Sequence, residues 1–306
     1  VSMVNYYPAK VKIGACLLSV ASIGSVATLP MYRRRDLAST LLKMAEEKMK
    51  KEETDVAIIS GEGGIYEKFG AFRVGCVAGY MIDIDRLSDD KNITISAYTD
   101  DDFDDIRLMY DKEEIRYLRS DDEFKALIKG QTYPEPGEST YLEIIRENGK
   151  TVAYVAVENS HEPIRLLIQE IGGSRKAIYA ALFKIMAKHG HKELLFPVER
   201  TDEINGLLPN SMRMMTDQYA SFRVMDWGRF LNKMGPYFET KNARVEYHDE
   251  NTGIELIING QAIGFADEKE LLEFVFGSPQ ETTKPDRKFK DLFPIPFVWT
   301  NNLNYE

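Results

Sequence analysis

Residues 26–38 combine residue types that could bind a phosphate-containing ligand. A short strand-like run, 26–28, is followed by a break at Pro30, three consecutive arginines at 33–35 and the start of an amphipathic pattern. The pattern predicts a helix from about residue 37. The first N–H groups of a helix have no partner inside it, and the helix dipole favours negative charge there. Arginine guanidinium groups add paired donors that match phosphate oxygens. The alternative is a solvated basic helix start without a ligand.

The same residues resemble the acetyl-CoA motif of the Gcn5-related N-acetyltransferase (GNAT) superfamily. That motif consists of Arg or Gln, two further residues, Gly, one residue, and Gly or Ala. Arg33 and Ala38 match its ends, whereas Asp36 stands where the family usually has glycine. A side chain restricts this turn, and a carboxylate repels a pyrophosphate. The resemblance implies that acetyl-CoA is bound by the residues Val26, Ala27, Thr28, Arg33, Arg34, Arg35, Asp36, Leu37 and Ala38.

A second motif that could carry chemistry follows at Gly64-Ile65-Tyr66-Glu67-Lys68-Phe69-Gly70. In many acetyltransferases of this superfamily a tyrosine at the corresponding place reprotonates the CoA thiolate, which implies that Tyr66 is the general acid. The pKa of a phenol, about 10, lies above that of a thiol, about 8.5. A well-placed phenol can still deliver its proton as charge develops on sulfur. The alternative is that Tyr66 packs as an ordinary aromatic side chain.

The elements that position these motifs form a first segment, residues 1–90. We expect the strands Val11–Ser19, Ile23–Leu29, Val56–Ile59 and Phe72–Asp83. Leu37, Leu41, Leu42, Ala45 and Met49 recur at helical spacing between the second and third of them. A complete GNAT domain has two further strands and two helices ahead of these elements. The resemblance therefore implies a partial first domain that lacks its N-terminal strands.

A second segment, residues 91–205, repeats the strand–turn–helix order. We expect a strand over Ile93–Tyr98, a helix opened by the acidic run 100–105, and a hairpin around Asn148-Gly149. A further strand then leads through Gly172-Gly173 into a helix over Ser174–Lys188. The segment resembles another GNAT fold, but its turn does not match the cofactor motif. We interpret it as structural rather than as a second active site.

A third segment, residues 206–306, alternates short helices and strands. We expect a helix over Trp227–Phe238, a tight turn at Asn259-Gly260, and a last helix over Glu268–Phe276 capped by Asp267. This order resembles the sterol-carrier-type domain of one acetyltransferase subgroup. The apolar, proline-rich run Phe293–Trp299 should be pinned on the body of the protein.

Together these segments predict a mixed α+β protein with tandem GNAT-like folds and a sterol-carrier-like domain. That architecture resembles the mycobacterial "enhanced intracellular survival" (Eis-like) aminoglycoside acetyltransferases. In that family the terminal carboxylate reaches the first active site, so the resemblance implies that the α-carboxylate of Glu306 is the general base. The alternative is a disordered chain end.

Composition restricts the classes of partner and compartment. The net charge of −10 makes nucleic acid an unfavourable partner and weakly favours cationic amines. Cys16 and Cys76 belong to no metal-binding spacing, and the four histidines complete none, so we expect no metal. No apolar run approaches the ~20 residues of a membrane helix, and no signal peptide is visible. We therefore expect a cytoplasmic protein that does not bind membranes.

The function predicted from these residues is transfer of an acetyl group from acetyl-CoA to a primary amine, either aminoglycoside-like, a polyamine or a peptide amine. A small-molecule amine is the expected partner, and the resemblance allows a homo-oligomer. One alternative is a non-catalytic binding or regulatory protein on a decayed GNAT fold. Another is lipid binding by the third segment, which predicts an apolar cavity among Trp227, Phe230, Leu231, Leu256, Ile258, Phe265 and Phe274.

Overall fold

The computed structural model describes residues 1–61, 63–130, 139–161, 164–250, 253–278 and 287–304 of the 306-residue chain. The chain forms two compact units whose parts are not consecutive in sequence. Unit 1 joins residues 1–76 to residues 217–297. Unit 2 combines residues 77–216 with the described tail residues 298–304.

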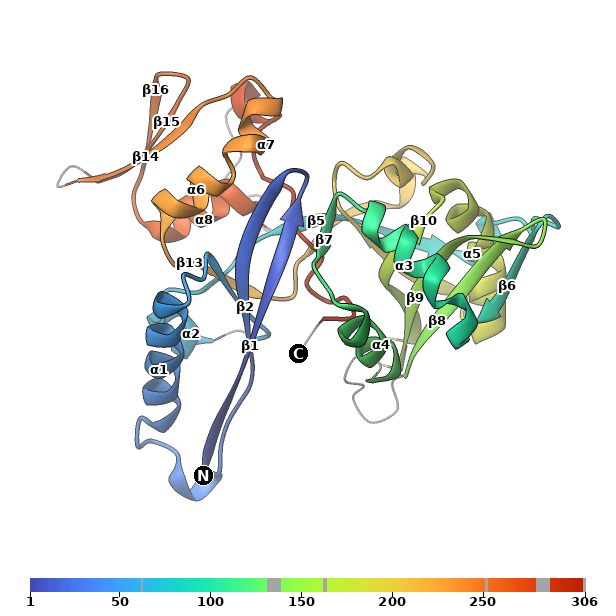
Figure 1. The fold of residues 1–306 in the computed structure, drawn as a ribbon, viewed down its shortest axis with the longest axis horizontal. Coiled ribbons are helices and arrows are strands. Elements are labelled where there is room, and N and C mark those ends of the chain that lie inside the picture. The colour runs from blue at the N-terminus through green and yellow to red at the C-terminus, as the bar shows by residue number, and fades with distance from the viewer. Residues whose placement is uncertain (62, 131–138, 162–163, 251–252, 279–286, 305–306) are drawn as a thin grey trace. The chain divides into compact units, whose positions relative to one another are not determined.

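Unit 1 is built on a mixed sheet with the strand order β4-β13-β3-β2-β1, of which β13, β2 and β1 are labelled in Figure 1. Its strands are β1 (Ser2–Ile13), β2 (Cys16–Thr28), β3 (Val56–Ile59), β4 (Phe72–Arg73) and β13 (Ser221–Val224). β2 runs antiparallel to β1 and parallel to β3. β13 runs antiparallel to both β3 and β4. A strand from far along the chain therefore completes the sheet of the N-terminal residues.

The hairpin between β1 and β2 corrects one prediction. A single strand over Val11–Ser19 was expected, but β1 ends at Ile13, β2 begins at Cys16, and these two residues pair. Gly14 in the turn has φ +56°, a conformation that glycine adopts readily. The prediction was wrong because buried apolar residues alternate on both sides of the turn, so the hydrophobic pattern alone does not mark it.

The helices of unit 1 are α1 (Leu37–Lys51), α2 (Gly64–Lys68), α6 (Trp227–Lys233), α7 (Gly235–Thr240) and α8 (Glu268–Phe276). α1 buries Leu42, Ala45 and Met49 in one cluster with side chains of β2 and β3. The predicted helix Trp227–Phe238 is two helices instead. Pro236 explains the break, because it lacks an N–H group and its ring clashes with the preceding turn of a continuous helix.

A small antiparallel sheet in unit 1 has the order β14-β15-β16. It consists of β14 (Val245–Glu250), β15 (Gly253–Ile258) and β16 (Gln261–Phe265). Asn259 and Gly260 have φ +50° and +83°, which confirms the predicted tight turn. The Asp267 side chain accepts a hydrogen bond from the Glu270 N–H at the start of α8, which confirms the predicted cap.

The core beside this small sheet is filled by aromatic rings. The ring centroids of Trp227 and Phe230 lie 5.9 Å apart, and those of Phe265 and Phe274 lie 5.2 Å apart. Phe293 lies 4.8 Å from Phe274 and is fully buried. Rings at these distances pack directly on one another. This packing favours an ordinary core over the apolar cavity that the lipid-binding alternative predicts.

A buried carboxylate ties the two chain stretches of unit 1 together. Asp55, which is fully buried, accepts hydrogen bonds from the Ser19 N–H at 2.8 Å and the Arg229 Nε at 3.0 Å. The Lys233 Nζ lies 2.7 Å from the Asp55 Oδ2, the oxygen that also accepts from the Ser19 N–H. Two cations from α6 thus neutralise a charge that follows α1, so residues 217–297 are part of the folded unit that holds β1 to β4.

Unit 2 contains a seven-stranded sheet with the order β12-β5-β11-β10-β9-β8-β6. The strands are β5 (Cys76–Asp83), β6 (Ile93–Ala97), β8 (Ser139–Glu147), β9 (Lys150–His161), β10 (Ile164–Gly173), β11 (Glu193–Val198) and β12 (Arg213–Asp217), with β7 (Ile115–Tyr117) outside this order. β10 and β11 pair in parallel, so this sheet is also mixed. Asn148 and Gly149 have positive φ in the β8–β9 turn, which confirms the predicted hairpin.

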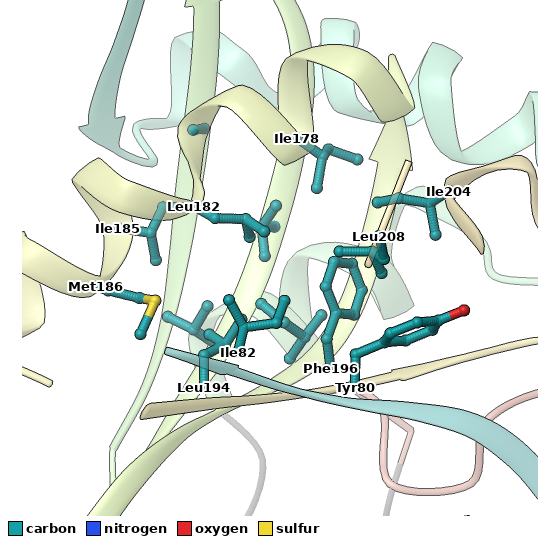
Figure 2. Close-up of a cluster of buried hydrophobic side chains, with 14 of the residues drawn as sticks. Tyr80, Ile82, Ile178, Leu182, Ile185, Met186, Leu194, Phe196, Ile204 and Leu208 are labelled. Carbon is teal, nitrogen blue, oxygen red and sulfur yellow. The ribbon is translucent and has the colours of Figure 1, made fainter. Parts of the chain in front are cut away.

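The helices of unit 2 are α3 (Phe103–Lys112), α4 (Asp121–Gly130) and α5 (Arg175–His189). α5 lies on the sheet and buries Ile178, Leu182 and Ile185 against side chains of the strands (Figure 2). Tyr80 at the edge of this cluster is fully buried, and its hydroxyl donates to the Asn205 Oδ1 at 2.9 Å. The hydroxyl is therefore satisfied despite its burial.

The run Phe293–Trp299 packs on the protein, as predicted. Phe293, Ile295 and Phe297 are buried in unit 1. Leu303 and Asn304 are buried in unit 2. Among the described residues, no helix is both long enough and apolar enough to span a membrane.

Candidate functional site

One edge of β2 lacks a strand partner beyond the end of β3. β2 pairs with β3 only from Val20 to Ile23, and the Ser60 N–H then donates to the Ile23 carbonyl at 3.2 Å. β2 nevertheless continues to Thr28 while its opposite edge remains paired with β1. No described strand pairs with residues 24–28 on the side away from β1. Extended backbone at such an edge can pair with an added chain.

A β-bulge lies at the start of this unpaired stretch. The register advances by two residues on β1, from Met3 to Asn5, but by three on β2, from Gly24 to Ala27. Ser25 in the bulge has φ +50°. A bulge bends its strand and increases the local twist. β2 therefore changes direction just where its pairing with β3 ends.

Hydrogen bonds on the β1 side show which backbone groups face the unpaired edge. The Ala27 carbonyl accepts from the Ser2 Oγ at 3.1 Å, and the Leu29 N–H donates to the Val1 carbonyl at 2.9 Å. Backbone groups of successive strand residues alternate between the two edges. The backbone groups of Val26 and Thr28 therefore face the unpaired edge.

Three exposed arginines follow β2 in a tight turn. The chain passes through a short 3-10 helix, Pro30–Tyr32, before it reaches them. The Arg33 Nε donates to the Thr28 carbonyl at 3.2 Å, and the Arg35 guanidinium lies 5.3 Å from the centre of the Tyr32 ring. These contacts fold the turn back on itself. The guanidinium groups remain exposed, so they are available to an anion.

Asp36, which stands at the glycine position of the GNAT motif that this turn resembles, has a left-handed backbone conformation. Its φ is 54° and its ψ is 19°, and its side chain makes no capping hydrogen bond to α1. Glycine adopts this conformation freely, whereas aspartate is among the side chains that tolerate it best. The substitution therefore keeps the shape of the turn and adds an exposed carboxylate.

The N-terminus of α1 adds backbone N–H donors next to the three arginines. The first hydrogen bond inside the helix runs from the Thr40 N–H to the Asp36 carbonyl at 2.9 Å. The N–H groups of Leu37, Ala38 and Ser39 precede that bond and have no acceptor within the helix. With the preceding arginines they form a local concentration of donors and positive charge that suits a phosphate group.

Tyr66 packs on the same hydrophobic cluster as α1. Tyr66 and Val26 are both partly buried against a cluster that includes Ile23 of β2 and Leu42 of α1. Burial raises the pKa of the Tyr66 phenol above its ordinary value. The phenol is therefore protonated at neutral pH and can serve as a proton donor. Tyr66, the unpaired strand β2 and α1 therefore pack around one hydrophobic cluster.

β13 supports the Tyr66 turn (residues 63–70) and Gly61 just before it, and the sequence pattern does not indicate this support. The Ser221 Oγ donates to the Gly61 carbonyl at 2.9 Å, and the Arg223 guanidinium lies 4.6 Å from the centre of the Phe69 ring. An Arg223 nitrogen also lies 2.9 Å from the Glu46 carboxylate of α1. Nothing in the local sequence pattern around β13 indicates which strands it joins.

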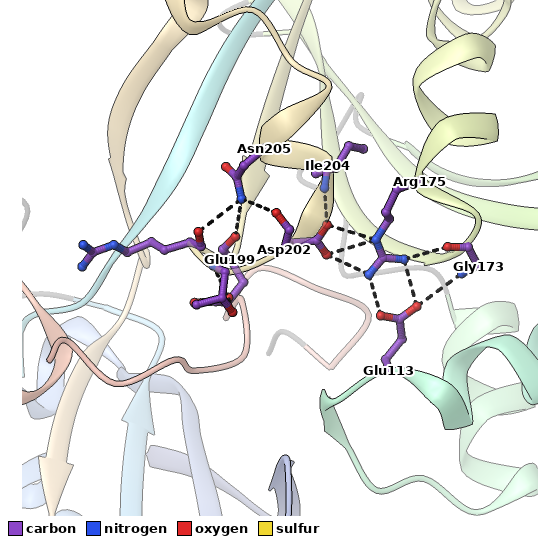
Figure 3. Close-up of polar contacts among 9 residues, drawn as sticks. Glu113, Gly173, Arg175, Glu199, Asp202, Ile204 and Asn205 are labelled. Atoms are coloured by element: carbon purple, nitrogen blue, oxygen red, sulfur yellow. Dashed lines mark hydrogen bonds and ion pairs between the residues drawn. The ribbon is translucent and has the colours of Figure 1, made fainter. Parts of the chain in front are cut away.

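The corresponding turn of unit 2 is closed by the protein's own side chains (Figure 3). Glu113 accepts hydrogen bonds from the Gly173 N–H at 3.2 Å and from the Arg175 guanidinium at 2.9 Å. Asp202 accepts from the same guanidinium at 2.8 Å. Ser174 caps α5. The Gly173 N–H and the Arg175 guanidinium are thus already paired with carboxylates of the chain, which favours a structural role for the turn.

Glu306 lies outside the described residues. The described tail is held two residues earlier, where the Asn304 Oδ1 accepts from the buried Arg119 Nε at 2.8 Å. Arg119 is also paired with Glu170 at 2.7 Å. Among the described residues no group of three or more His, Cys, Asp or Glu side chains could hold a metal ion.

Comparisons with known proteins agree with this geometry. Residues 1–74 match the sequence model of the acetyltransferase (GNAT) domain family, and no curated protein matches the chain. A probable N-acyltransferase of unknown function from Enterococcus faecalis superposes with a TM-score of 0.60 at 18% identity, covering 85% of this chain and 70% of that one.

Two further solved structures share the fold over long stretches. A GCN5-related N-acetyltransferase from Anabaena variabilis has a TM-score of 0.61 at 13% identity, covering 99% of this chain and 86% of that one. Eis1 from Mycobacterium abscessus has a TM-score of 0.56 at 12% identity, covering 87% and 73%. The unpaired strand, the arginine turn, the domain match and these superpositions together show that this chain has the GNAT acetyltransferase fold.

Proposed function

We propose that this protein is an acyl-CoA-dependent N-acyltransferase that transfers an acetyl group from acetyl-CoA to a primary amine. The observation that carries the proposal is the unpaired edge of β2 leading through three exposed arginines into the N-terminus of α1. Extended backbone suits an amide-containing arm, and the turn suits a pyrophosphate. The match of residues 1–74 to the GNAT domain supports the same activity.

In this proposal the backbone groups of Val26 and Thr28 pair with the amides of the pantetheine arm, with Ala27 holding the strand against β1. The guanidinium groups of Arg33, Arg34 and Arg35 bind the pyrophosphate together with the first N–H groups of α1, which belong to Leu37 and Ala38. Asp36 opposes this binding, because its carboxylate faces the same anion at short range.

The proposed chemistry is direct acyl transfer. The amine nitrogen attacks the thioester carbon, a C–N bond forms, the C–S bond breaks, and Tyr66 donates its phenolic proton to the departing sulfur. The amine must lose a proton, and we assign this step to the α-carboxylate of Glu306, directly or through a water molecule. Holding amine and thioester together supplies most of the acceleration, because proximity contributes up to ~7–11 kcal/mol.

The acceptor is proposed at the level of its chemical class. A primary amine of an aminoglycoside, a polyamine or a peptide is consistent with the net charge of −10, which weakly attracts cationic molecules. The superposition on Eis1 from Mycobacterium abscessus extends over most of the chain and supports including aminoglycosides in a first screen.

A second candidate, a non-catalytic binding protein on a GNAT fold, is favoured by one observation. Asp36 adds negative charge in the turn that would hold the pyrophosphate. If the Asp36 carboxylate abolishes acetyl-CoA binding, the protein has the GNAT fold but does not catalyse acetyl transfer. Acetyl-CoA affinity distinguishes the two candidates.

The test is a calorimetric titration of acetyl-CoA into the protein and into Asp36→Gly. Micromolar binding to the unmodified chain is the expected result and leads to a screen of amine acceptors. Binding only to Asp36→Gly would mean that this residue has switched the site off. Absence of binding to both proteins would overturn the proposed function.

A further inference from the structure

We propose that Gly61 and Ser221 together position the Tyr66 phenol for proton transfer. The Tyr66 ring packs on Gly61, and Ser221 holds Gly61 in place. This inference rests on the proposed function. Gly61 follows the end of β3, and Ser221 is the first residue of β13. Ser221 pairs with Ile59 in the sheet register, which places it beside the chain segment that leads into the Tyr66 turn.

The absence of a side chain at Gly61 leaves room for the Tyr66 ring. A Cβ atom added at Gly61 would lie 3.1 Å from Tyr66 Cε2 and 3.5 Å from the Tyr66 hydroxyl oxygen. The first distance is shorter than ordinary van der Waals contact, so the ring would have to move by a few tenths of an ångström. Gly61 does not have positive φ. Contact with Tyr66, rather than backbone strain, is therefore what glycine avoids at this position.

Two hydrogen bonds hold Gly61 in place beneath the ring. Its carbonyl accepts from the Ser221 Oγ at 2.9 Å, and its N–H donates to the Ile59 carbonyl at 2.8 Å. Ser221 is itself buried. The position of Gly61 is thus fixed by a strand that lies 160 residues away in sequence. Since the ring packs on Gly61, the same strand fixes the Tyr66 hydroxyl.

Gly61 and Ser221 are positioning residues in this scheme, because they act through Tyr66. Gly61→Ala should lower kcat by about fivefold or more with little change in KM for acetyl-CoA, since a misplacement of about 1 Å can cost 10²-fold in rate. Ser221→Ala should lower kcat in the same direction without adding any atom to the site. Gly264→Ala is the matched control, because a Cβ there meets nothing within 4 Å.

The deciding experiment is a double-mutant cycle that combines Gly61→Ala with Tyr66→Phe, with thermal unfolding of each variant as a folding check. If Gly61 acts through Tyr66, Gly61→Ala should leave kcat unchanged in the Tyr66→Phe background. The same cycle with Ser221→Ala keeps the test decisive if Gly61→Ala fails to fold. Equal losses of kcat in both backgrounds would overturn the inference.

The proposed function and this inference fail in different ways. If Tyr66→Phe alone leaves kcat unchanged, the acid role assigned to Tyr66 is wrong. If Tyr66→Phe lowers kcat while Gly61→Ala and Ser221→Ala leave it unchanged, the acid role of Tyr66 stands. The claim that Gly61 and Ser221 position Tyr66 is then wrong.

Discussion

The guanidinium of Arg223 lies over the ring of Phe69, with its carbon 4.6 Å from the ring centre, while one of its nitrogens pairs with Glu46 at 2.9 Å. One side chain of β13 thus contacts both the end of the Tyr66 turn and α1. Phe69 directly follows α2, so this contact holds the end of the Tyr66 turn against β13.

Arg223→Met should destabilise the protein by about 1–2 kcal/mol, because it removes a cation–π contact and a half-buried ion pair while keeping the length of the side chain. Chemical denaturation measures the change. Arg244→Met is the control, since Arg244 also pairs with a glutamate but is 83% exposed. An equal loss of stability in the control would contradict a specific role for the contact with Phe69.

The pair between Arg223 and Glu46 also predicts a pH dependence. Burial alone raises the pKa of Glu46, but hydrogen bonds from Lys50 and Arg223 outweigh it and lower the pKa below its ordinary value. A depressed folded-state pKa stabilises the protein above the unfolded value, about 4.3, and this stability is lost as pH falls through the folded value. Unfolding free energies of Glu46→Gln and the unmodified protein should therefore converge at acidic pH.

Asp36→Gly should tighten acetyl-CoA binding by about threefold to tenfold, because it removes both a left-handed non-glycine residue and a carboxylate beside the proposed pyrophosphate. Asp36→Asn separates the two effects, since asparagine tolerates the left-handed conformation but carries no charge. Calorimetry at low and high salt measures both variants. A gain that is the same at all salt concentrations would argue against the charge as its cause.

Tyr66→Phe should lower kcat by about 100-fold if the phenol is the general acid. The acid form must be protonated, so activity is lost as pH rises through the pKa of Tyr66. Burial raises that pKa, and the alkaline limb should therefore lie above pH 10 in a profile of kcat. Unchanged kcat in Tyr66→Phe at several pH values would exclude this role.

Asp55→Asn should destabilise unit 1 by about 2–3 kcal/mol, because it leaves Arg229 and Lys233 facing an uncharged group in a partly buried position. Glu246→Gln, an exchange at a 42% exposed carboxylate, should change the free energy of unfolding far less. Thermal unfolding followed by circular dichroism compares them. A loss confined to the helical segment 227–240 would contradict a single cooperative unit.

Asn304→Ala should cost about 1–3 kcal/mol, because donors of the buried Arg119 guanidinium then lose a partner. The tail should also become more accessible to proteases, which limited proteolysis with mass spectrometry detects. Asn301→Ala provides the comparison, since its contact with Gln169 is long, at 3.4 Å. Equal protease sensitivity in the two variants would show that Arg119 does not anchor the tail.

Local sequence determined the parts of this protein whose interactions lie within a few residues. The helix start after Arg33–Arg35, the cap at Asp267 and the turns at Asn148-Gly149 and Asn259-Gly260 were predicted correctly. In each case the side chain or glycine that fixes the conformation belongs to the element itself.

The expected single strand Phe72–Asp83 was wrong, because these residues form β4 and β5 in two different sheets. Two other local predictions failed where the hydrophobic pattern was uninformative. Apolar residues flank the Gly14 turn on both sides, so the hairpin looked like one strand. The apolar periodicity from Trp227 onward continues past Pro236, so two helices looked like one. In each of these two cases one residue outweighed the apolar pattern around it. Gly14 permits a tight turn, and Pro236 ends a helix.

Only the tertiary structure decided what surrounds the candidate site. The pairing of β13 with β3 brings Ser221 to Gly61 and Arg223 to Phe69, although these partners are more than 150 residues apart. The closure of the Gly173 turn by Glu113 and Asp202 depends on contacts of the same kind. Strand pairing and ion pairing across such separations depend on how the whole chain folds. The residues next to one partner in the sequence therefore do not indicate which distant residue it contacts.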